Sequence, residues 1–229
     1  MTDRPDRPLY KLYYMPTTAS LSVHWVLVFL EQQANVRFTT QLVSFPRSDQ
    51  RSPAFLHLNP KGRVPTLLIH PDTPQEHVLT ESPAILQYLA ERHPEARLAP
   101  PVTDEPSRAK YLETMTYLAN TLLPALRDNF YADKDGEPGE PARAVKTLAQ
   151  KRINQAWDYL DRQLNGHEWL VGNDRSAADF LLVSIMGWSE HLHNESCQRS
   201  NLRRLAEKME RQEDWLEMKR REQQAEAEV

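Results

Sequence analysis

Two adjacent polar residues, Glu81 and Ser82, combine a carboxylate and a hydroxyl that together suit recognition of a small charged molecule. Helical spacing of apolar residues follows them as far as Arg92, which predicts that they occupy the first turn of a helix. The unpaired N–H groups and positive dipole end of a helix N-terminus attract a carboxylate. Ser82 can add a hydroxyl donor, and Glu81 can accept from an ammonium group. The pair suits a zwitterionic amino-acid end; the alternative is ordinary helix capping.

Val64 and Pro65 begin an expected strand that continues to residue 69. A peptide bond before proline adopts the cis form at a cost of only about 0.5 to 1 kcal/mol, and a cis bond here can turn the N–H and C=O of Val64 outward. Those groups can pair with an extended peptide that lies alongside as an antiparallel strand. The alternative is that Pro65 simply starts an edge strand. Lys61, in the preceding loop, can balance a second carboxylate or be merely solvated.

Three hydroxyl side chains, Thr17, Thr18 and Ser20, lie between an expected strand at 9–15 and an expected buried helix at 21–33. Each can cap that helix, because a side-chain oxygen at this position accepts from the first unpaired N–H groups. Each can equally donate its proton to an anion bound near the start of the helix. The residue types alone leave both roles open.

Composition excludes several function classes. The 229 residues carry a formal net charge of −4, which gives no reason to expect a nucleic-acid or membrane partner. The 6 glycines form neither a dinucleotide fingerprint nor a phosphate-binding loop. The single cysteine, Cys197, rules out an internal disulfide and a zinc ribbon and favours a reducing compartment. The longest strictly apolar run, 25–30, is too short to span a membrane, so we expect a cytoplasmic protein.

His191 and His193 suggest a metal site at first sight, because Glu190 and Glu195 flank them. Side chains two residues apart on a helix point to different faces, however, and no second ligand pair accompanies them. We therefore expect no metal and interpret this segment as a solvated helix face. His24, in the first expected helix, is interpreted as a packing residue.

The order of expected elements divides the chain into two domains. Residues 9–93 alternate strands, expected at 9–15, 37–43, 64–69 and 77–80, with helices, expected at 21–33, 52–58 and 81–92. Four prolines in 94–106 indicate a linker, and 107–229 shows only helical periodicity. Residues 1–8 are expected to form a flexible arm. The tail from 217, rich in charged and small residues, is interpreted as a solvated helix end or a frayed tail.

This order, βαβ-α-ββα joined by a Pro-rich linker to an all-helical domain, resembles the soluble glutathione transferases. Three motifs sharpen the resemblance: N-P-K-G-R-V-P-T-L at 59–67, T-E-S-P-A-I-L at 80–86 and S-A-A-D at 176–179. They are similar to the family's N-P-x-G-x-V-P-x-L, its E-S-x-A-I helix start and its S/T-x-A-D capping box. The resemblance covers nearly the whole chain. It implies a thioredoxin-like α/β domain followed by an all-α domain, in a cytoplasmic homodimer with a role in detoxification.

The resemblance also implies roles for individual residues. The implied glutathione-binding residues are Val64, Pro65, Glu81, Ser82 and Lys61, with the Val64 backbone on the cysteinyl unit. The stretch 14–22 most resembles the bacterial beta-type enzymes, but the cysteine that they carry would fall on Ala19. Without it, a mixed disulfide with the enzyme is not expected, and a hydroxyl would stabilise the glutathione thiolate. Thr18, which matches the serine of the zeta- and theta-like branches, ranks first, Ser20 second and Thr17 third.

The implied activity is attack of the bound glutathione thiolate on a small electrophile, either in conjugation or in peroxide reduction. The resemblance implies no metal and no cofactor beyond glutathione. Tyr111, Met115 and Tyr117 can shape a pocket for the electrophile, or can be core or dimer contacts. Two alternatives stay open: a non-catalytic binding or assembly module, and a glutathione-dependent isomerase or dehalogenase of the same fold.

Overall fold

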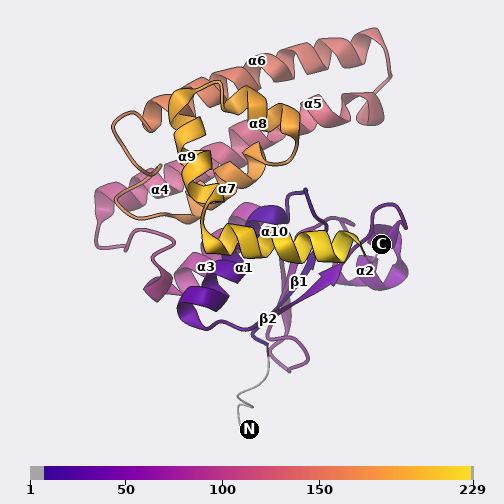
Figure 1. The fold of residues 1–229 in the computed structure, drawn as a ribbon. Helices are drawn as coiled ribbons and strands as arrows, with labels where there is room; N and C mark the ends of the chain where they lie inside the picture. The colour runs from indigo at the N-terminus through magenta and orange to yellow at the C-terminus, as the bar shows by residue number, and fades with distance from the viewer. Residues whose placement is uncertain (1–7, 228–229) are drawn as a thin grey trace.

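The first half of the chain is an α/β domain. The computed structural model describes residues 8–227, so the expected arm at 1–8 lies outside the described residues except for its last residue. The elements are β1 (Tyr10–Tyr14), α1 (Leu21–Ala34), β2 (Phe38–Leu42), η1 (Asp49–Arg51), α2 (Pro53–Leu58), β3 (Thr66–Ile69), β4 (His77–Thr80) and α3 (Ser82–Arg92). The four strands form one sheet in the order β2-β1-β3-β4. This is the thioredoxin-like domain that the sequence predicted (Figure 1).

Burial along the strands follows from the strand order. Strand β1 is parallel to β2 and antiparallel to β3, which pairs antiparallel with β4. All four residues of the inner strand β3 are buried, whereas the edge strands β2 and β4 are mostly exposed. In β1, alternate residues are buried, as expected for a strand with a core-facing side. The two inner strands, β1 and β3, therefore fix the positions of the loop after β1 and the loop before β3.

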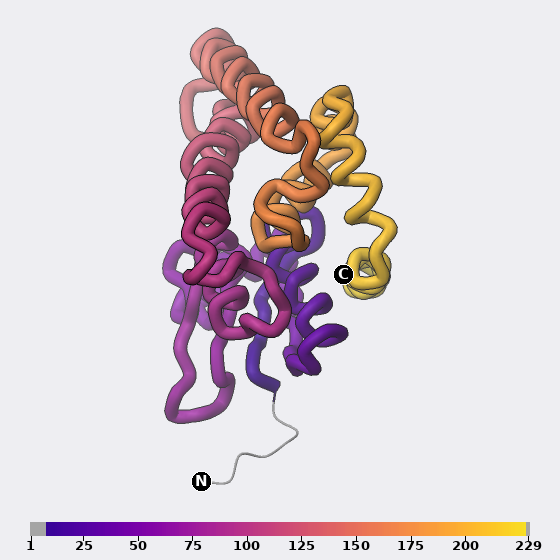
Figure 2. Tube along the Cα trace, turned by 90° about the vertical axis from the view of Figure 1, so that its left-hand side faces the viewer, coloured from indigo at the N-terminus to yellow at the C-terminus, as the bar shows by residue number. Residues whose placement is uncertain are grey.

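The second half is helical, as expected. Its elements are η2 (Pro94–Ala96), α4 (Glu105–Tyr117), the π-helical turn η3 (Leu118–Leu122), α5 (Leu123–Asp135), α6 (Glu140–Gln163), α7 (Ala177–Met186), α8 (Glu190–Ser196), α9 (Ser200–Glu210) and α10 (Glu213–Glu226). Figure 2 shows this half stacked on the sheet-containing half. Among residues 8–227, no helix combines the length and the apolar character needed to cross a membrane.

Helix α1 is the element that both halves share. Every residue from 21 to 30 is buried. The helix packs against β1 and α3 of its own half and against α7 and α10 of the helical half. Trp25 is fully buried, and its ring lies 4.8 Å from that of Phe180 in α7. Because each such side chain contributes about 1.5 to 3 kcal/mol on burial, α1 is firmly fixed, and with it the loop at its N-terminus.

The Pro-rich segment 94–106 is fastened to the helical half. Leu98 is fully buried, and its C=O accepts a hydrogen bond from the N–H of Ala177 at 2.7 Å. Ser176 and Asp179 form the predicted capping box at the start of α7. The Asp179 carboxylate also accepts from the N–H of Leu170 at 2.9 Å, and complete burial raises the pKa of Asp179 to about 6. The box therefore has a structural role, while the exact domain boundaries stay a prediction.

The tail from residue 217 is a helix end and not a frayed tail; Arg220, Gln223 and Gln224 are exposed as expected, but one stripe of the helix is buried, which the sequence interpretation did not foresee. Helix α10 lies beside α1 in both views (Figures 1 and 2). Asp214, Met218 and Glu222 recur every four residues and are all buried. Two of these three side chains are carboxylates, which hydrophobic patterning assigns to a solvated face. For this reason the buried stripe could not be recognised from the sequence.

Candidate functional site

Hydroxyl groups close the loop between β1 and α1. The Thr18 and Ser20 hydroxyls both lie within hydrogen-bond distance of the C=O of Met15, at 2.7 and 2.8 Å. Their oxygens are 2.9 Å apart, and Ser20 Oγ also accepts from the N–H of Met15 at 3.1 Å. The Ser20 side chain makes no capping hydrogen bond to α1, so it closes the loop rather than capping the helix. Thr17 is exposed at a φ of 54°, and within the described chain it makes no hydrogen bond to this cluster.

A count of protons shows that one of these two hydroxyls is available for a ligand. Two hydroxyl protons serve three contacts, namely two to the Met15 carbonyl and one between the oxygens themselves. The Thr18 proton can therefore turn to another acceptor while Ser20 keeps the carbonyl paired. Ser20 is fully buried, whereas Thr18 is only half-buried. Of the two, Thr18 is the one that a ligand can reach.

The first turn of α3 lies against the same loop. Ser82 Oγ donates to the C=O of Ala19 at 2.7 Å, across a separation of 63 residues. Its proton is thus used within the protein, which differs from its expected role as a donor to an anion. The N–H groups of Ser82 and Ala84 belong to the first turn, where the helix itself offers them no acceptor, and Pro83 has no N–H. Those two amides can receive an anion beside the hydroxyl loop.

Glu81 precedes this turn in a strained backbone conformation. Its φ is 74°, in the left-handed region that costs a non-glycine residue about 1 to 3 kcal/mol. Lys61 Nζ donates to Glu81 Oε1 at 2.5 Å and to Thr80 Oγ1 at 2.8 Å. The Lys61 and Glu81 side chains are 47% and 66% exposed, and an exposed ion pair contributes only about 0 to 1 kcal/mol. Either residue can therefore exchange its partner for a charged group of a ligand at little cost.

The loop before β3 holds Val64 beside these residues. The Val64-Pro65 peptide bond is cis, as the sequence suggested. The Asn59 side chain donates to the C=O of Arg63 at 2.8 Å and to Thr66 Oγ1 at 2.9 Å, and this pins both ends of the turn. Among residues 8–227, neither the N–H nor the C=O of Val64 appears in a hydrogen bond. Its backbone is available to an extended ligand, and the fixing role of Asn59 is one that sequence reasoning missed.

Gly62, inside this loop, has a backbone that only glycine suits. Its φ is 59°, and an added Cβ would lie 2.9 Å from the C=O of Gln50. A contact this short to a backbone atom requires the loop to move. The glycine of the N-P-x-G motif is therefore needed to bring the 59–67 segment against the η1 turn.

The residues expected to shape an electrophile pocket lie elsewhere. Tyr111 and Met115 are buried at 0% and 3% exposure inside the main core, which is the alternative that the sequence left open. Tyr117 stacks on Tyr159 of α6 with ring centroids 4.6 Å apart. It also lines a shallow hollow made only by α4 and η3, so no residue of the first domain takes part. This burial favours the core alternative for Tyr111 and Met115, and the pocket role of the three residues stays a prediction.

The end of α5 carries a group of charged and aromatic side chains, and its Asp135 feels the charge of Arg63 from the first domain. Arg127 forms an ion pair with Asp135. The hydrogen bond from Arg127, with the charge of Arg63 from the first domain, holds the pKa of Asp135 below its usual value. Arg127 and Lys134 also lie over the ring of Tyr131, at 5.1 and 5.0 Å from its centroid. Sequence reasoning missed this face, although these residues recur at helical spacing.

Cys197, the single cysteine, is poorly suited to nucleophilic chemistry. It follows α8 in the helical half and is half-buried. Burial raises the pKa of its thiol, and only the thiolate is a nucleophile. Because position 19 is alanine, the described chain offers no activated thiol of its own.

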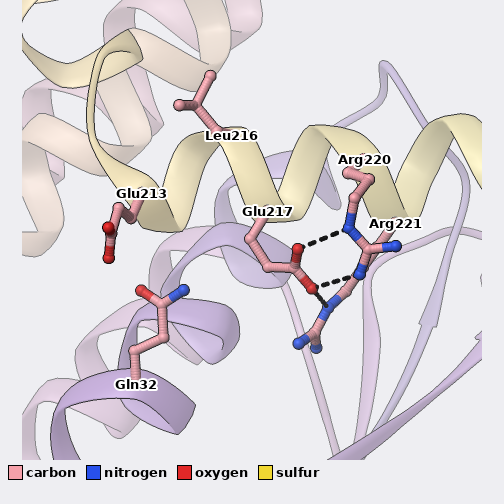
Figure 3. A pocket seen from close by; sticks show the side chains of 6 residues that line it. All are labelled: Gln32, Glu213, Leu216, Glu217, Arg220 and Arg221. Atoms are coloured by element: carbon pink, nitrogen blue, oxygen red, sulfur yellow. Dashed lines mark hydrogen bonds and ion pairs between the residues drawn. The ribbon is translucent and has the colours of Figure 1, made fainter.

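A second hollow lies between α1 and α10, away from the loop that contains Thr18 and Ser20 (Figure 3). Its lining residues are Gln32, Glu213, Leu216, Glu217, Arg220 and Arg221. Figure 3 shows Glu217 bonded to both arginines, and Arg221 also pairs with Glu31 of α1. Glu217, Arg220 and Arg221 thus satisfy one another. We therefore place the candidate site at the loop of Thr18 and not in this hollow.

Comparisons with known proteins agree with this geometry. Residues 8–91 match the glutathione S-transferase N-terminal domain, and residues 125–215 match the glutathione S-transferase C-terminal domain. The glutathione S-transferase GstA of Escherichia coli O157:H7 is 30% identical over 180 residues, which are 78% of this chain and 82% of that protein.

Two solved structures resemble the whole chain. A glutathione transferase from Methylococcus capsulatus is 28% identical with a TM-score of 0.76, and the match covers 93% of this chain and 98% of that one. A sphingomonad glutathione S-transferase complexed with glutathione is 25% identical with a TM-score of 0.74, over the same shares of both chains. This chain belongs to the glutathione S-transferase family.

Proposed function

We propose that this glutathione transferase binds glutathione between the Val64 backbone and the first turn of α3, with the thiol beside Thr18. The observation that carries the proposal is the hydrogen bond from Ser82 to Ala19, which brings an anion-accepting helix N-terminus against the hydroxyl loop. The sphingomonad relative was solved with glutathione, which supports the choice of ligand.

Three parts of glutathione find complementary groups here. The γ-glutamyl carboxylate lies on the N–H groups of Ser82 and Ala84, and its ammonium group pairs with Glu81. The extended backbone around the cysteinyl unit pairs with the N–H and C=O of Val64. The glycine carboxylate attracts Lys61. Lys61 and Glu81 already pair with each other, so binding a zwitterion replaces one weak exposed ion pair by two contacts.

Thr18 supplies most of the stabilisation that the thiolate needs. Lowering a thiol pKa from about 8.5 by two units requires about 2.7 kcal/mol of preference for the anion. The N-terminus of α1 contributes only about 0.3 to 1 kcal/mol at an exposed site. A hydroxyl donating to the charged sulfur contributes about 1.5 to 3 kcal/mol, which covers the remainder. Ser20 keeps the Met15 carbonyl paired while Thr18 turns to the sulfur.

The reaction is attack by this thiolate on a small electrophile. The thiol proton passes to water, and the sulfur electron pair forms a new bond to an electron-poor carbon as the leaving group departs. In conjugate addition, the adjacent carbon takes a proton from water instead. The wall facing the electrophile is the end of α5, where the half-exposed Tyr131 offers an aromatic surface next to Arg127. Peroxide reduction uses the same thiolate.

Two further features stay predictions from the sequence. We expect two copies of the chain to associate, which light scattering on the purified protein measures directly. We also expect a cytoplasmic location, because the lone Cys197 suits a reducing compartment.

Calorimetric titration of the purified chain with glutathione tests the binding site. We expect one saturable site, and Glu81→Ala should raise the Kd about tenfold by removing the ammonium partner. Glu76→Ala is the matched control, because Glu76 is an exposed carboxylate just before β4 and should leave the Kd unchanged. Failure of the unmodified chain to bind glutathione would refute the proposal.

An activity assay separates transfer from simple binding. The chain is supplied with glutathione and, in turn, an aryl halide, a conjugate acceptor and an organic hydroperoxide. We expect turnover of at least one of them that saturates with glutathione and is not supported by free cysteine at the same concentration. Tight glutathione binding with no turnover of any class would favour the non-catalytic alternative.

A further inference from the structure

The C-terminal helix α10 reaches across the domains to the first helix of the α/β half. It follows α9 of the helical half, and Figures 1 and 2 both show it running beside α1. Helix α1 begins one residue after Ser20, which closes the hydroxyl loop. The last helix of the chain is therefore attached to the element that carries the candidate site.

Two ionic contacts anchor α10 without touching the loop. At its start, Asp214 accepts from Trp25 Nε1 at 2.7 Å and receives both terminal nitrogens of Arg175, at 3.2 and 2.6 Å. Further along, Arg221 pairs with Glu31 at 2.5 Å. These contacts, with buried Met218, already hold the helix on α1.

A third contact is different in kind. His24 Nδ1 and Glu222 Oε1 lie 3.1 Å apart, and their side chains are only 1% and 2% exposed. The other polar atoms of the pair, His24 Nε2 and Glu222 Oε2, are buried without a partner among the described residues. Well-packed apolar side chains would dock a helix at least as well as a buried ionisable pair. Docking alone does not account for this pair.

His24 is in direct contact with the hydroxyl loop. Its backbone N–H makes the first helical hydrogen bond of α1, to the C=O of Ser20 at 2.9 Å, so the imidazole is carried by the first turn after the loop. Its ring lies 4.8 Å from that of Tyr14, the residue before Met15. Met15 is in turn the residue whose carbonyl and N–H bind the Thr18 and Ser20 hydroxyls. His24 thus contacts both ends of the loop.

We infer that Glu222 is a positioning residue for the active-site loop, acting through His24. Its carboxylate fixes the imidazole, and the imidazole, carried by the first turn of α1, packs on Tyr14 at the end of β1, so that it sets the two ends of the loop that holds the Thr18 hydroxyl. This role rests on the proposed function of the loop. It makes the C-terminal helix part of the active-site support rather than a peripheral addition.

The test compares Glu222→Leu with Arg221→Met, its neighbour on α10. Arg221→Met removes the ion pair that docks α10 on Glu31 of α1, together with the pair with Glu217 inside α10, but leaves His24 paired, so it is the control for docking alone. Amide hydrogen exchange of the ligand-free chain reads the loop directly, because the Met15 and Ser20 amides bond to loop hydroxyls. We expect about tenfold faster exchange in 15–20 with Glu222→Leu and no change there with Arg221→Met.

Kinetics provide the second readout. We expect Glu222→Leu to lower kcat about tenfold with little change in the KM for glutathione, since a displaced hydroxyl affects the thiolate and not the binding groups. Glu222→Gln, which keeps an acceptor for His24, should retain most of kcat. The double variant His24→Leu/Glu222→Leu removes the unpaired imidazole, so it should restore stability without restoring kcat.

Two results would overturn the inference. One is unchanged exchange in 15–20 with Glu222→Leu. The other is an equal change with Arg221→Met, which would reduce Glu222 to an ordinary docking contact. A chain that does not bind glutathione would instead refute the proposed function, and the exchange data would still decide the coupling between α10 and the loop.

Discussion

Replacing Thr18 with valine removes one hydroxyl at nearly constant side-chain shape. The Met15 carbonyl keeps the Ser20 hydroxyl at 2.8 Å, and the loop loses one long hydrogen bond, from the N–H of Ser20 to Thr18 Oγ1 at 3.3 Å. A hydrogen bond to a charged sulfur is worth about 1.5 to 3 kcal/mol, and one pKa unit corresponds to 1.36 kcal/mol. Thr18→Val should therefore raise the pKa of the bound glutathione thiol by about one to two units.

The assay is the ultraviolet absorbance of the thiolate, recorded for glutathione on the enzyme as the pH is raised. Below the thiol pKa, the thiolate fraction and the turnover rate should both fall about 10- to 100-fold in Thr18→Val. Thr18→Ser keeps the hydroxyl and should titrate like the unmodified chain. Thr17→Val is the matched control, because Thr17 is exposed in the same loop and lies outside the hydroxyl cluster.

An unchanged thiol pKa in Thr18→Val would refute the assignment. A shift that appears in Thr17→Val instead would move the catalytic hydroxyl to Thr17. Ser20→Ala is less informative, because it also orphans the N–H of Met15 and perturbs the whole loop.

Three other substitutions test separate parts of the account. Glu81→Gly should raise the free energy of unfolding by about 1 kcal/mol, because glycine accepts the φ of 74° without strain, and should weaken glutathione binding about tenfold. Chemical denaturation measures the stability and calorimetry the binding. Glu81→Ala should weaken binding to the same extent with no gain in stability. Asp179→Ala should cost about 3 kcal/mol or more in urea denaturation by orphaning buried donors of Leu170 and Ser176, whereas exposed Asp174→Ala should cost almost nothing. Burial lowers the pKa of His93, so near pH 6.5 the unfolded chain binds a proton that the folded chain does not bind. The free energy of unfolding should therefore fall as the pH drops below about 6.5. Denaturation curves between about pH 7 and pH 5 should show a smaller loss of stability for His93→Gln.

The fold could be predicted because its local signals agree with one another. The aromatic-rich segment of β1, the apolar run 25–30 of α1 and the helical periodicity after residue 107 each indicate the element that the structure contains. The S-A-A-D motif at 176–179 directly indicates the start of helix α7. Element ends differ from the expectation by only a few residues, since helix and strand ends depend on packing as well as on residue type.

The expected binding residues could be located from the sequence more sharply than the catalytic hydroxyl, and the role of both stays a prediction. Val64, Glu81 and Ser82 could be located because motifs with fixed spacing carry them. The partner of Ser82 could not, since it is a backbone carbonyl, at Ala19, that no side-chain pattern signals. The ranking of Thr17, Thr18 and Ser20 as thiolate donors likewise depends on which hydroxyl already bonds the Met15 carbonyl. Only the coordinates show those hydrogen bonds.

Two features of the structure were beyond what sequence patterns decide. Tyr111 and Met115 were left open between an electrophile pocket, the core and a dimer contact, because helical periodicity shows which residues share a face but not what that face meets. The pairing of His24 with Glu222 spans 198 residues and joins a residue expected in the core to one expected in a solvated tail. Buried polar pairs of this kind cannot be predicted from the pattern of apolar residues.

The most direct test of the central claim is a glutathione titration of the isotope-labelled chain, followed by the backbone amide signals in NMR spectra. We expect saturable shifts of the Val64, Ser82 and Ala84 amide signals with a single Kd. The amide signals of Thr18 and of the loop around it should shift with the same Kd. Shifts confined to other residues, such as those around Glu217 and Arg220 in the hollow of Figure 3, would contradict it.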